Sequence, residues 1–418
     1  MIGSIVRNTW SIFLGLSFLM LGNGLQGTIT GWRAAIEGFS ATTTGVIMTG
    51  YYIGFLVGSI VAPILVRRVG HIRVFAAVAS VASTSVLIQI MIITPPTWFF
   101  VRLVTGACFA GTYVIVESWL NARSDNNTRG RVLSIYMIIT YLSMAGGQWL
   151  LNLADPVEYD LFLLASILLS LSLVPVLISR INAPEIELQE KISLRELYRH
   201  APSGTLSLFF IAMAHGAMFS MGAVYAHQAG LNIAETVLFM STFILLGAIV
   251  QWPIGWISDR MDRRITIIGT SMTAVLLSAL AGMYSLSSGN LILVFGVLGA
   301  MSLVIYSLAI ALTNDRLSPE KMVEASSTMV LIYGFGSILG PTATGIILES
   351  LGHQGFFVHL GVTHLVIAVI AAYQMSANPI TPLEDQVPYQ NVPPKATMVA
   401  MEAVALEAEE SSQAAEHH

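Results

Sequence analysis

The stretch WISDRMDRR, from Trp256 to Arg264, contains five charged residues within six consecutive positions. It lies between two apolar segments, FILLGAIVQWPIG at 243–255 and ITIIGTSMTAVLLSALAGM at 265–283. Only 10% of the whole chain is charged, whereas a soluble domain carries about 25%. The few charges are confined to short islands such as this one, and the apolar stretches between the islands are long enough to cross a bilayer as helices.

Twelve apolar stretches of this kind predict an all-α polytopic membrane protein with twelve transmembrane helices. The short alternating segments of a membrane β-barrel are absent from the sequence. The predicted spans are, approximately, 8–31, 43–65, 74–94, 98–120, 131–153, 160–180, 204–226, 235–257, 265–286, 291–313, 325–348 and 356–375.

Positive charges predict the orientation of these helices. If the N-terminus is cytoplasmic and the spans alternate, only Arg33 and Arg102 of the 19 Lys and Arg residues fall outside cytoplasmic segments, which leaves 17 inside. An excess of Lys and Arg in cytoplasmic loops is the general rule for membrane helices. We therefore expect a multi-pass protein of a bacterial inner membrane with both termini in the cytoplasm.

The chain is predicted to divide into two bundles of six helices. The longest cytoplasmic loop, 181–203, separates an N-terminal bundle, 1–180, from a C-terminal bundle, 204–375. This loop is compatible with a short amphipathic helix at the membrane surface or with a simple linker. A tail at 376–418 is rich in Pro, Ala, Glu and Gln, a composition that predicts a disordered cytoplasmic segment.

The two halves echo each other at an offset of 192 residues. The matching pairs are Arg68 with Arg260, Asn23 with His215, and Tyr141 with Tyr333. Each match alone is at chance level, but together with the equal numbers of spans they support a duplication. Two parallel six-helix repeats are an architecture of secondary transporters, which bind substrate near the membrane midplane between the repeats.

Small residues recur every four positions along the second predicted span, at Gly50, Gly54, Gly58 and Ala62. Such a stripe lets two helices approach closely in a membrane. Packing alone explains it, and it predicts a helix contact rather than a site.

Several motifs resemble the major facilitator superfamily. GWISDRMDRR, from Gly255 to Arg264, is similar to the family's loop pattern G-x-x-x-D-R-x-G-R-R/K, with an aspartate in place of the second glycine. PILVRRVGHI, after the second span, resembles a degraded copy in which Arg67 replaces the aspartate, and RLVTG at 102–106 resembles the family's fourth-span pattern. The stretches 37–76 and 117–137 further resemble the YcaD-like bacterial branch.

This resemblance implies a cytoplasmic gate made by the charged loops. Its residues are Arg68, Gly70, Asp259, Arg260, Arg263 and Arg264. In the family, the loop aspartate and arginines form a latch that closes the cytoplasmic side, so Asp259 is expected to cap or pair with the start of the fifth span near Arg129 and Arg131. A carboxylate at a helix N-terminus gains about 0.3–1 kcal/mol from the helix dipole when exposed. A topology anchor without a switching role remains the alternative.

Polar side chains inside the predicted spans define a candidate substrate site, because such groups are costly in hydrocarbon and tend to be functional. Helical geometry places Asn23 and Gln26 on one face of the first span and Arg102 and Tyr113 on one face of the fourth. In the parallel-repeat architecture, polar residues of the second half face the same cavity. The complete predicted set is Asn23, Gln26, Arg33, Arg102, Tyr113, Tyr141, Gln148, His215, Tyr225, Tyr306 and Tyr333.

Two charged residues inside spans have specific predicted roles, each with a structural alternative. Arg102 would recognise an anionic group of the substrate, or else bond backbone carbonyls of the first span. Glu117 is the one carboxylate clearly within a span, and a buried carboxylate suits a proton carrier. The alternative for Glu117 is a plain ion pair with a cytoplasmic arginine such as Arg123.

These features predict a secondary active transporter that moves a small organic solute, with an organic anion favoured, by alternating access and with proton coupling at Glu117. Efflux of amphipathic compounds and a non-transporting membrane sensor with the same fold stay open as alternatives. The sequence has no nucleotide loop, metal-ligand cluster or nucleophile triad, so we expect no enzyme activity, cofactor, metal or nucleic-acid partner. The expected partners are the small-molecule substrate, the lipid bilayer and protons, and the protein is expected to be a monomer.

Overall fold

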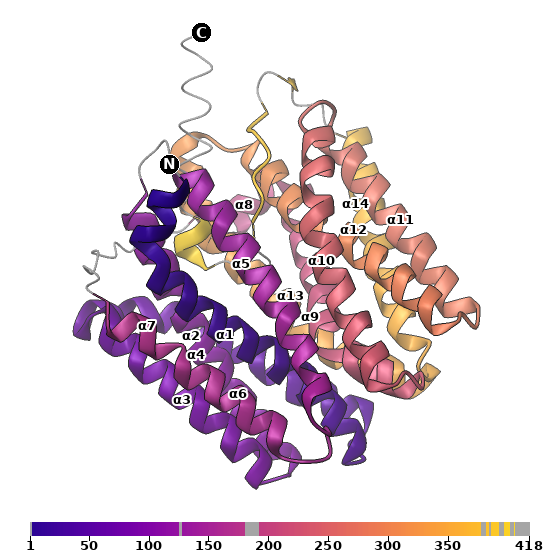
Figure 1. Ribbon diagram of the computed structural model, residues 1–418. Coiled ribbons are helices and arrows are strands. Elements are labelled where there is room, and N and C mark those ends of the chain that lie inside the picture. Colours follow the sequence, from indigo (N-terminus) through magenta and orange to yellow (C-terminus); the bar gives the residue numbers. More distant parts are fainter. Residues whose placement is uncertain are drawn as a thin grey trace.

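The computed structural model describes residues 2–124, 128–179, 192–377, 382–383, 386–392, 397–401 and 405, and its regular elements are helices (Figure 1). The first half contains α1 Ile2–Ile36, α2 Ala41–Val69, α3 His71–Met91, α4 Pro95–Ala122, α5 Arg129–Trp149, the 3₁₀ turn η1 Leu150–Leu153, α6 Asp160–Leu171 and α7 Leu173–Leu177. The short α8, Leu194–His200, follows. The second half contains α9 Pro202–Gln228, α10 Ile233–Ser258, α11 Arg263–Met283, α12 Ser288–Asn314, α13 Pro319–Leu351 and α14 Gly355–Ala377.

Each of the twelve predicted spans coincides with a helix, and the all-α membrane architecture is confirmed. Among the described residues, 11 helical segments are long and apolar enough to cross a membrane, with α6 and α7 counting together as Asp160–Leu177. The long helix outside this set is α5, whose 21 residues include two arginines, one glutamine and several hydroxyl side chains.

The helices extend beyond the predicted apolar windows because polar caps in the loops continue them. Ser40 begins α2 by accepting a hydrogen bond from the backbone N–H of Thr43. Asn232 and Glu235 form a reciprocal capping box at the start of α10. Gly70 separates α2 from α3 at a φ of 89°, a left-handed conformation that favours glycine.

Close backbone contacts through glycine hold the helices of each half together. A Cβ atom on Gly50 would lie 2.6 Å from the carbonyl oxygen of Phe99, and one on Gly58 would lie 2.5 Å from that of Ala107. A Cβ on Gly54 would overlap the carbonyl oxygen of Leu103. The glycines of α2 therefore repeat every four residues against carbonyls of α4 that repeat at the same spacing, which confirms the predicted helix contact.

The same device supports the predicted duplication. Gly24 of α1 packs on the backbone of Met144 in α5, where a Cβ would overlap the carbonyl oxygen. Gly216 of α9, 192 positions later, packs on α13, where a Cβ would lie 2.6 Å from the carbonyl oxygen of Ser337. The first and fifth spans of both halves are thus packed through equivalent glycines.

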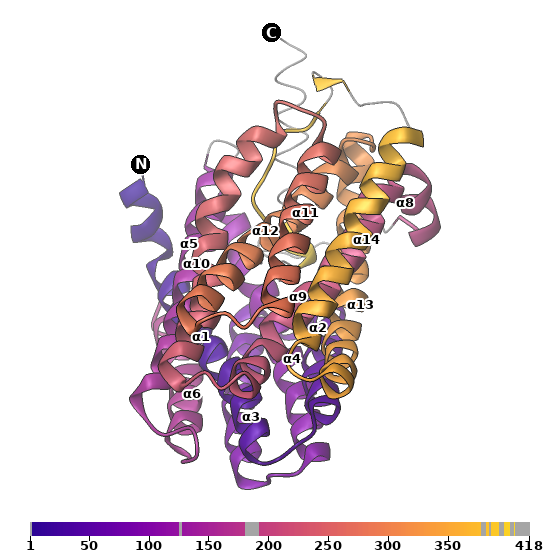
Figure 2. The same ribbon diagram turned by 90° about the vertical axis from the view of Figure 1, so that its right-hand side faces the viewer.

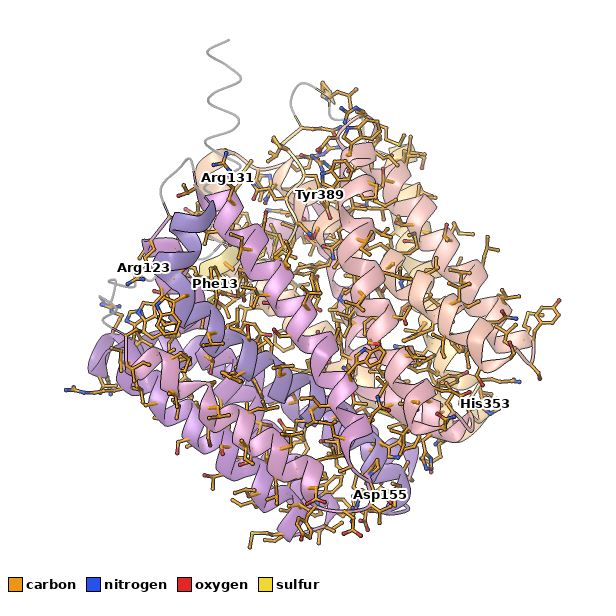
Figure 3. All side chains as sticks on the ribbon, viewed as in Figure 1. Phe13, Arg123, Arg131, Asp155, His353 and Tyr389 are labelled. Atoms are coloured by element: carbon orange, nitrogen blue, oxygen red, sulfur yellow. The ribbon has the colours of Figure 1, made fainter. Side chains whose placement is uncertain are left out.

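The two ends of the helical bundle differ in charge. We call one end the basic face, because it carries Arg123 and Arg131 together with the loop at 258–264, and the other the opposite face, which carries Asp155 and His353 (Figure 3). The halves meet closely toward the opposite face. There a Cβ on Gly45 would lie 2.5 Å from the carbonyl oxygen of Pro341, so α2 and α13 approach through their backbones.

The C-terminal segment departs from the predicted disorder. Several of its described residues are packed inside the protein, and the exposed fractions of Val392, Thr397 and Met401 are 1%, 0% and 1%. Figures 1 and 2 show the yellow trace re-entering the bundle from the end at which α1 starts. The polar and charged composition predicted disorder, but apolar residues within it supply enough buried surface to hold these stretches in place.

The central loop contains the short helix α8, in agreement with the helical alternative for part of this segment. Ser193 caps it by accepting a hydrogen bond from the N–H of Glu196, and Leu197 is completely buried. Glu196 pairs with Lys321 at 2.8 Å, a contact that holds the pKa of this exposed carboxyl below its usual range. Residues 181–191 of the predicted loop lie outside the described residues.

Candidate functional site

Arg102, on α4, has a buried guanidinium group inside the bundle. The residue is 4% exposed, and its Nε and Nη1 atoms have no hydrogen-bond partner among the described residues. The guanidinium carbon lies 4.5 Å from the centre of the Tyr51 ring, which is a cation–π distance. An aromatic face stabilises the positive charge but supplies no hydrogen-bond acceptor, so the donors of Arg102 remain available.

Polar and aromatic groups of the first half surround this arginine. The side-chain amide nitrogen of Asn23 is also buried, and it lies beside the hydroxyl groups of Tyr51 and Tyr113 without a hydrogen bond of good geometry to either. Tyr51 and Tyr52 meet edge to face with ring centres 5.4 Å apart. These two tyrosines of α2 were not part of the predicted site, although their position among glycines in GYYIGF was a possible signal.

The second half contributes a histidine and two tyrosines. Nδ1 of His215 and the hydroxyl of Tyr333 lie 2.9 Å apart, and the rings of Tyr306 and Tyr333 are 4.7 Å apart. Nε2 of His215 is buried without a partner in the described part of the chain. The equivalence of Asn23 and His215 across the duplication therefore extends to an unpaired nitrogen on each.

A small cavity lies between α2 and α13, where tyrosines of the first-half cluster face a tyrosine of the second-half cluster. It is lined by Tyr51, Tyr52 and Phe55 of the first half and by Tyr333 and Ser337 of the second, together with Leu56, Ser59, Val330 and Gly334. The lining is mainly aromatic, with hydroxyl groups at intervals. At about 20 Å³ the cavity has room for little more than a water molecule in this conformation, although aromatic walls with a few hydroxyl groups are typical of sites for small organic molecules.

Three predicted glutamine and tyrosine residues make contacts within the protein. Tyr141 accepts a hydrogen bond from Nε2 of Gln251 at 3.1 Å, which links α5 to α10. Gln148 accepts from the hydroxyl of Thr28. Gln26 bonds Gln89 at 3.4 Å, although its own side-chain oxygen has no partner among the described residues.

The structure places two predicted residues away from this cluster. Arg33 pairs with Glu37 at 2.6 Å and donates to the carbonyl of Pro156 at 3.1 Å, at the opposite face. Tyr225 packs in an aromatic group, with its ring 4.9 Å from that of Phe356 and 5.0 Å from that of Phe357. In these positions both side chains contact other parts of the protein and not the central cluster.

Glu117, near the basic-face end of α4, is 3% exposed and has uncharged partners among the described residues. Oε1 accepts from the hydroxyl of Tyr136 at 2.8 Å. Oε2 accepts from the backbone N–H of Thr397 at 3.2 Å and from its hydroxyl. The predicted alternative, an ion pair with Arg123, is not formed between these described side chains.

The charged island at 259–264 is organised differently from the expected latch. Oδ1 of Asp259 accepts from the backbone N–H of Tyr389 at 2.9 Å and lies 3.3 Å from Arg263, so its described partners are in the C-terminal segment and its own loop. Arg263 is buried and pairs with Asp315 at 2.7 Å. The described partners of Asp259 differ from the predicted one, which was the start of α5.

Burial dominates the electrostatics of Asp315, which follows α12. It raises the pKa of this carboxyl to about 6, while Arg263 and the N–H of Val387 act in the opposite direction. The N–H of Val387 donates to Oδ1 of Asp315 at 2.9 Å, and Arg263 donates to the carbonyl of Val387. This network was not predicted, because the tail residues that complete it were expected to be disordered.

The remaining residues of the predicted gate are dispersed along the basic face. Arg260 stacks on Trp256, with its guanidinium carbon 3.8 Å from the ring centre. Arg264 is buried and pairs with Asp262 at 2.7 Å. Arg68, the first-half equivalent of Arg260, is exposed beside Gly70.

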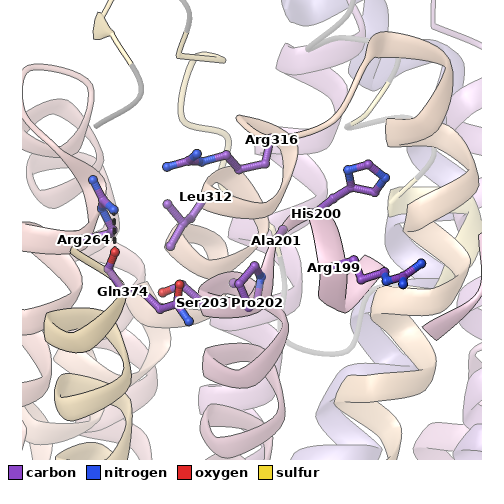
Figure 4. A pocket seen from close by; sticks show the side chains of 10 residues that line it. Arg199, His200, Ala201, Pro202, Ser203, Arg264, Leu312, Arg316 and Gln374 are labelled. Carbon is purple, nitrogen blue, oxygen red and sulfur yellow. Dashed lines mark hydrogen bonds between the residues drawn. The ribbon is translucent and has the colours of Figure 1, made fainter. Parts of the chain in front are cut away.

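A second hollow on the basic face has a basic lining. Its lining includes Arg199 of α8, Arg264 of α11, Arg316 just after α12 and Ser203 of α9, and Figure 4 shows Arg316 pointing toward the side of Arg264 while Arg199 points away from it. Its lining residues all follow residue 193, so they belong to α8 and the second half. The hollow thus lies outside the boundary between the halves, where the central cluster and Glu117 are found.

Comparisons with known proteins agree with this architecture. A model of the Major Facilitator Superfamily matches residues 12–281 and 204–395. The MFS-type transporter YcaD of Escherichia fergusonii is 23% identical over 378 residues, which cover 90% of this chain and 98% of that protein. YcaD of Escherichia coli is 23% identical over 354 residues, which cover 84% of this chain and 92% of that protein.

Solved transporter structures share the fold. The nucleoside transporter NupG superposes with a TM-score of 0.70 at 15% identity, over 89% of this chain and 98% of that chain. A bacterial homologue of the human lysosomal transporter Spinster, in an inward-facing and unoccupied conformation, superposes with a TM-score of 0.67 at 13% identity, over 98% of this chain and 97% of that chain. At these identities the likeness concerns the fold alone.

Proposed function

Because the chain belongs to the Major Facilitator Superfamily, we propose that it is a secondary active transporter of a small organic solute, working by alternating access in a bacterial inner membrane. The family and its structural neighbours indicate a transporter rather than an enzyme. The solute site that we propose lies between the halves, around Arg102, Asn23, His215 and Tyr333.

The observation that carries this proposal is the unsatisfied guanidinium of Arg102. A buried charge without hydrogen-bond partners is expensive, and proteins normally pair it. Tyr51 and the unpaired amide of Asn23 offset only part of that cost, because neither supplies a negative charge. A carboxylate, sulfonate or phosphate on the solute would supply both the charge and the acceptors, so an organic anion is the favoured class.

Side chains of the second half would contact the parts of the solute that Arg102 does not bind. Nε2 of His215 offers one free donor or acceptor, and Tyr333 holds the ring in place through Nδ1. The aromatic lining around Tyr52 and Phe55 would bury the apolar body of the solute. This lining also keeps efflux of amphipathic compounds as the second candidate, since such compounds need aromatic surface more than a cation.

Coupling and orientation complete the proposal. We assign proton coupling to Glu117, because it is a buried carboxylate whose described partners are neutral donors that remain compatible with a protonated side chain. The basic face would be cytoplasmic, as the charge bias predicts. The protein would act as a monomer, since the proposed site is complete within one chain.

The test begins with a thermal-shift screen of the purified protein against organic anions, neutral metabolites and amphipathic cations. Calorimetry with the stabilising compound then compares Arg102→Ala and Arg102→Lys with the unmodified protein. We expect Arg102→Ala to abolish binding of an anion and Arg102→Lys to weaken it strongly, because lysine lacks the planar fork of donors.

Arg33→Ala is the matched control, because that guanidinium is already paired with Glu37 at the opposite face. It should bind the compound as the unmodified protein does. If a folded, monodisperse Arg102→Ala protein binds an anion with unchanged affinity, Arg102 is structural. If only amphipathic cations stabilise the protein, the efflux candidate replaces the organic-anion proposal.

A further inference from the structure

The space between the halves on the basic face holds an extended segment of the chain's own C-terminal region. We define the C-terminal segment as the described residues 386–392 and 397–401. Toward the second half, its backbone bonds Asp259, Asp315 and Ser307 through the N–H groups of Tyr389, Val387 and Val392. Toward the first half, Thr397 bonds Glu117 through its N–H and its hydroxyl.

Side chains of the segment also pack closely against both halves, in addition to the hydrogen bonds of its backbone. The ring of Tyr389 covers Gly255 of α10 so tightly that a Cβ on that glycine would overlap the ring. Met401 lies over the site residue Tyr306, with its sulfur 3.8 Å from the hydroxyl, and its carbonyl accepts from Ser326 at 3.2 Å. Ala400 lines a small cavity together with Glu117, Leu120 and Tyr136.

The position of the segment has a mechanical consequence, because the halves already meet at the opposite face. There, besides the Gly45 contact, Thr49 of α2 donates to the carbonyl of Ile338 in α13 at 2.9 Å. With that side closed, alternating access requires the path to the central cluster to be open on the basic face. The C-terminal segment lies across that path, and Glu117 is buried beneath Thr397.

We propose that the C-terminal segment is an autoinhibitory plug, which closes the basic face by bridging the halves and shuts Glu117 off from water until the segment leaves. Release would expose Glu117 and the Tyr306 side of the central cluster at the same time. It would also free Asp259, the aspartate that the family resemblance assigns to the latch. The carboxylate of Asp259 would then bind the C-terminal segment in the closed state and the latch partner after the segment leaves.

The first experiment measures water access and needs no substrate. In a Cys108→Ser background, Leu120→Cys places a thiol beside Glu117 under the segment, where Leu120 is 2% exposed. The purified full-length protein is treated with a membrane-impermeant maleimide. We expect slow labelling, and roughly tenfold or faster labelling once Val392→Glu is added, because a buried carboxylate at this 1%-exposed position opposes docking.

Leu383→Glu is the matched control in the same tail, since Leu383 is 54% exposed and its substitution should leave labelling slow. A second releasing variant leaves the tail sequence intact. Gly255→Val should displace Tyr389 and speed labelling, whereas Gly269→Val, on a glycine with open space around its Cα, should not. If Leu120→Cys labels equally fast with and without Val392→Glu and Gly255→Val, the segment does not close the basic face and the proposal is overturned.

The second experiment measures flux in proteoliposomes, with the compound identified by the thermal-shift screen. This part rests on the proposed transport function. We expect Val392→Glu to transport several-fold faster than the unmodified protein and Leu383→Glu to transport at the unmodified rate. Faster labelling of the Leu120→Cys thiol without a gain in solute flux would overturn the inhibitory role of the segment. Absence of flux in every variant would contradict the transporter proposal, while the labelling result still decides whether the segment closes the basic face.

Discussion

At the level of single residues, Glu117 combines burial with neutral partners. Tyr136 and Thr397 both donate hydrogen bonds to its carboxyl group, and the described surroundings supply no cation to pair with it. Such a group changes its charge without breaking an ion pair. This is what a proton-carrying residue requires, and an ion-paired carboxylate such as Asp315 lacks it.

We expect Glu117→Gln to reduce uptake driven by a pH gradient to the level measured without a gradient, because glutamine cannot exchange a proton. Substrate exchange at equal pH should persist, since exchange needs no net proton movement. The measurement is uptake of the identified compound into proteoliposomes with and without an imposed gradient. Glu158→Gln, at an exposed loop position, is the control that should keep gradient dependence. A gradient-driven Glu117→Gln protein would remove this carboxylate from coupling.

The energetic cost of burying polar groups guided the choice of site residues from the sequence, and their part in binding stays a prediction. Arg102, Asn23 and His215 were selected because polar groups are expensive inside a span, and all three have buried, unpaired atoms. This criterion did not select Tyr51 and Tyr52, because burying a tyrosine inside a span costs little free energy. Which face of α2 these rings occupy depends on the packing of α2 on α4, which a single sequence does not specify.

At the level of elements, the glycine contact between α2 and α4 predicts that larger residues at these positions lower the stability of the protein. A Cβ on Gly54 would overlap the backbone of Leu103, and one on Gly106 would overlap that of Tyr51. Backbone carbonyls cannot move aside as flexible side chains do. We therefore expect Gly54→Ala or Gly106→Ala to cost at least about 1–3 kcal/mol of stability.

Thermal unfolding in detergent measures this effect. Gly269→Ala is the control, because a Cβ there meets open space, and it should be neutral or stabilise α11 by up to about 1 kcal/mol. Equal melting temperatures for Gly54→Ala and the unmodified protein would mean that α2 and α4 have room to separate. In that case the glycine stripe would not set their distance.

Helix positions were largely predictable, but helix ends and the tail were not. The apolar windows mark the part of each helix that suits hydrocarbon, while caps such as the Asn232–Glu235 box continue the helix into polar sequence. The tail was predicted from average composition, which hides the contributions of Val387, Val392 and Met401. These few apolar residues are buried against a surface formed by helices distant in the sequence, so no local sequence pattern could predict their burial.

At the level of the whole molecule, the charge difference between the two faces predicts the membrane orientation. We expect Arg73→Cys, on the basic face, to be labelled by an impermeant maleimide only after cells are permeabilised. Glu158→Cys, near the opposite-face loop around Asp155, should be labelled in intact cells. Both are placed in a Cys108→Ser background, and the reverse pattern would invert the proposed topology.

The architecture at this scale was the most predictable part. Equal numbers of spans and the offset of 192 residues predicted two repeats, and the equivalent glycines Gly24 and Gly216 give that offset a structural basis. The arrangement of the halves relative to each other was not predictable. It depends on small differences between contacts such as Gly45 with Pro341 and Tyr141 with Gln251, which belong to one arrangement among several.

The bond between Arg263 and Val387 also has a consequence for biosynthesis. The two residues are 124 positions apart, and the guanidinium of Arg263 is fully buried in the finished protein. While the ribosome is still translating α12 to α14, this arginine has neither Asp315 nor the Val387 carbonyl in its final place. The last helices of the second half must therefore insert before their charge network exists, and the nascent protein reaches its mature form only after the C-terminal segment has left the ribosome.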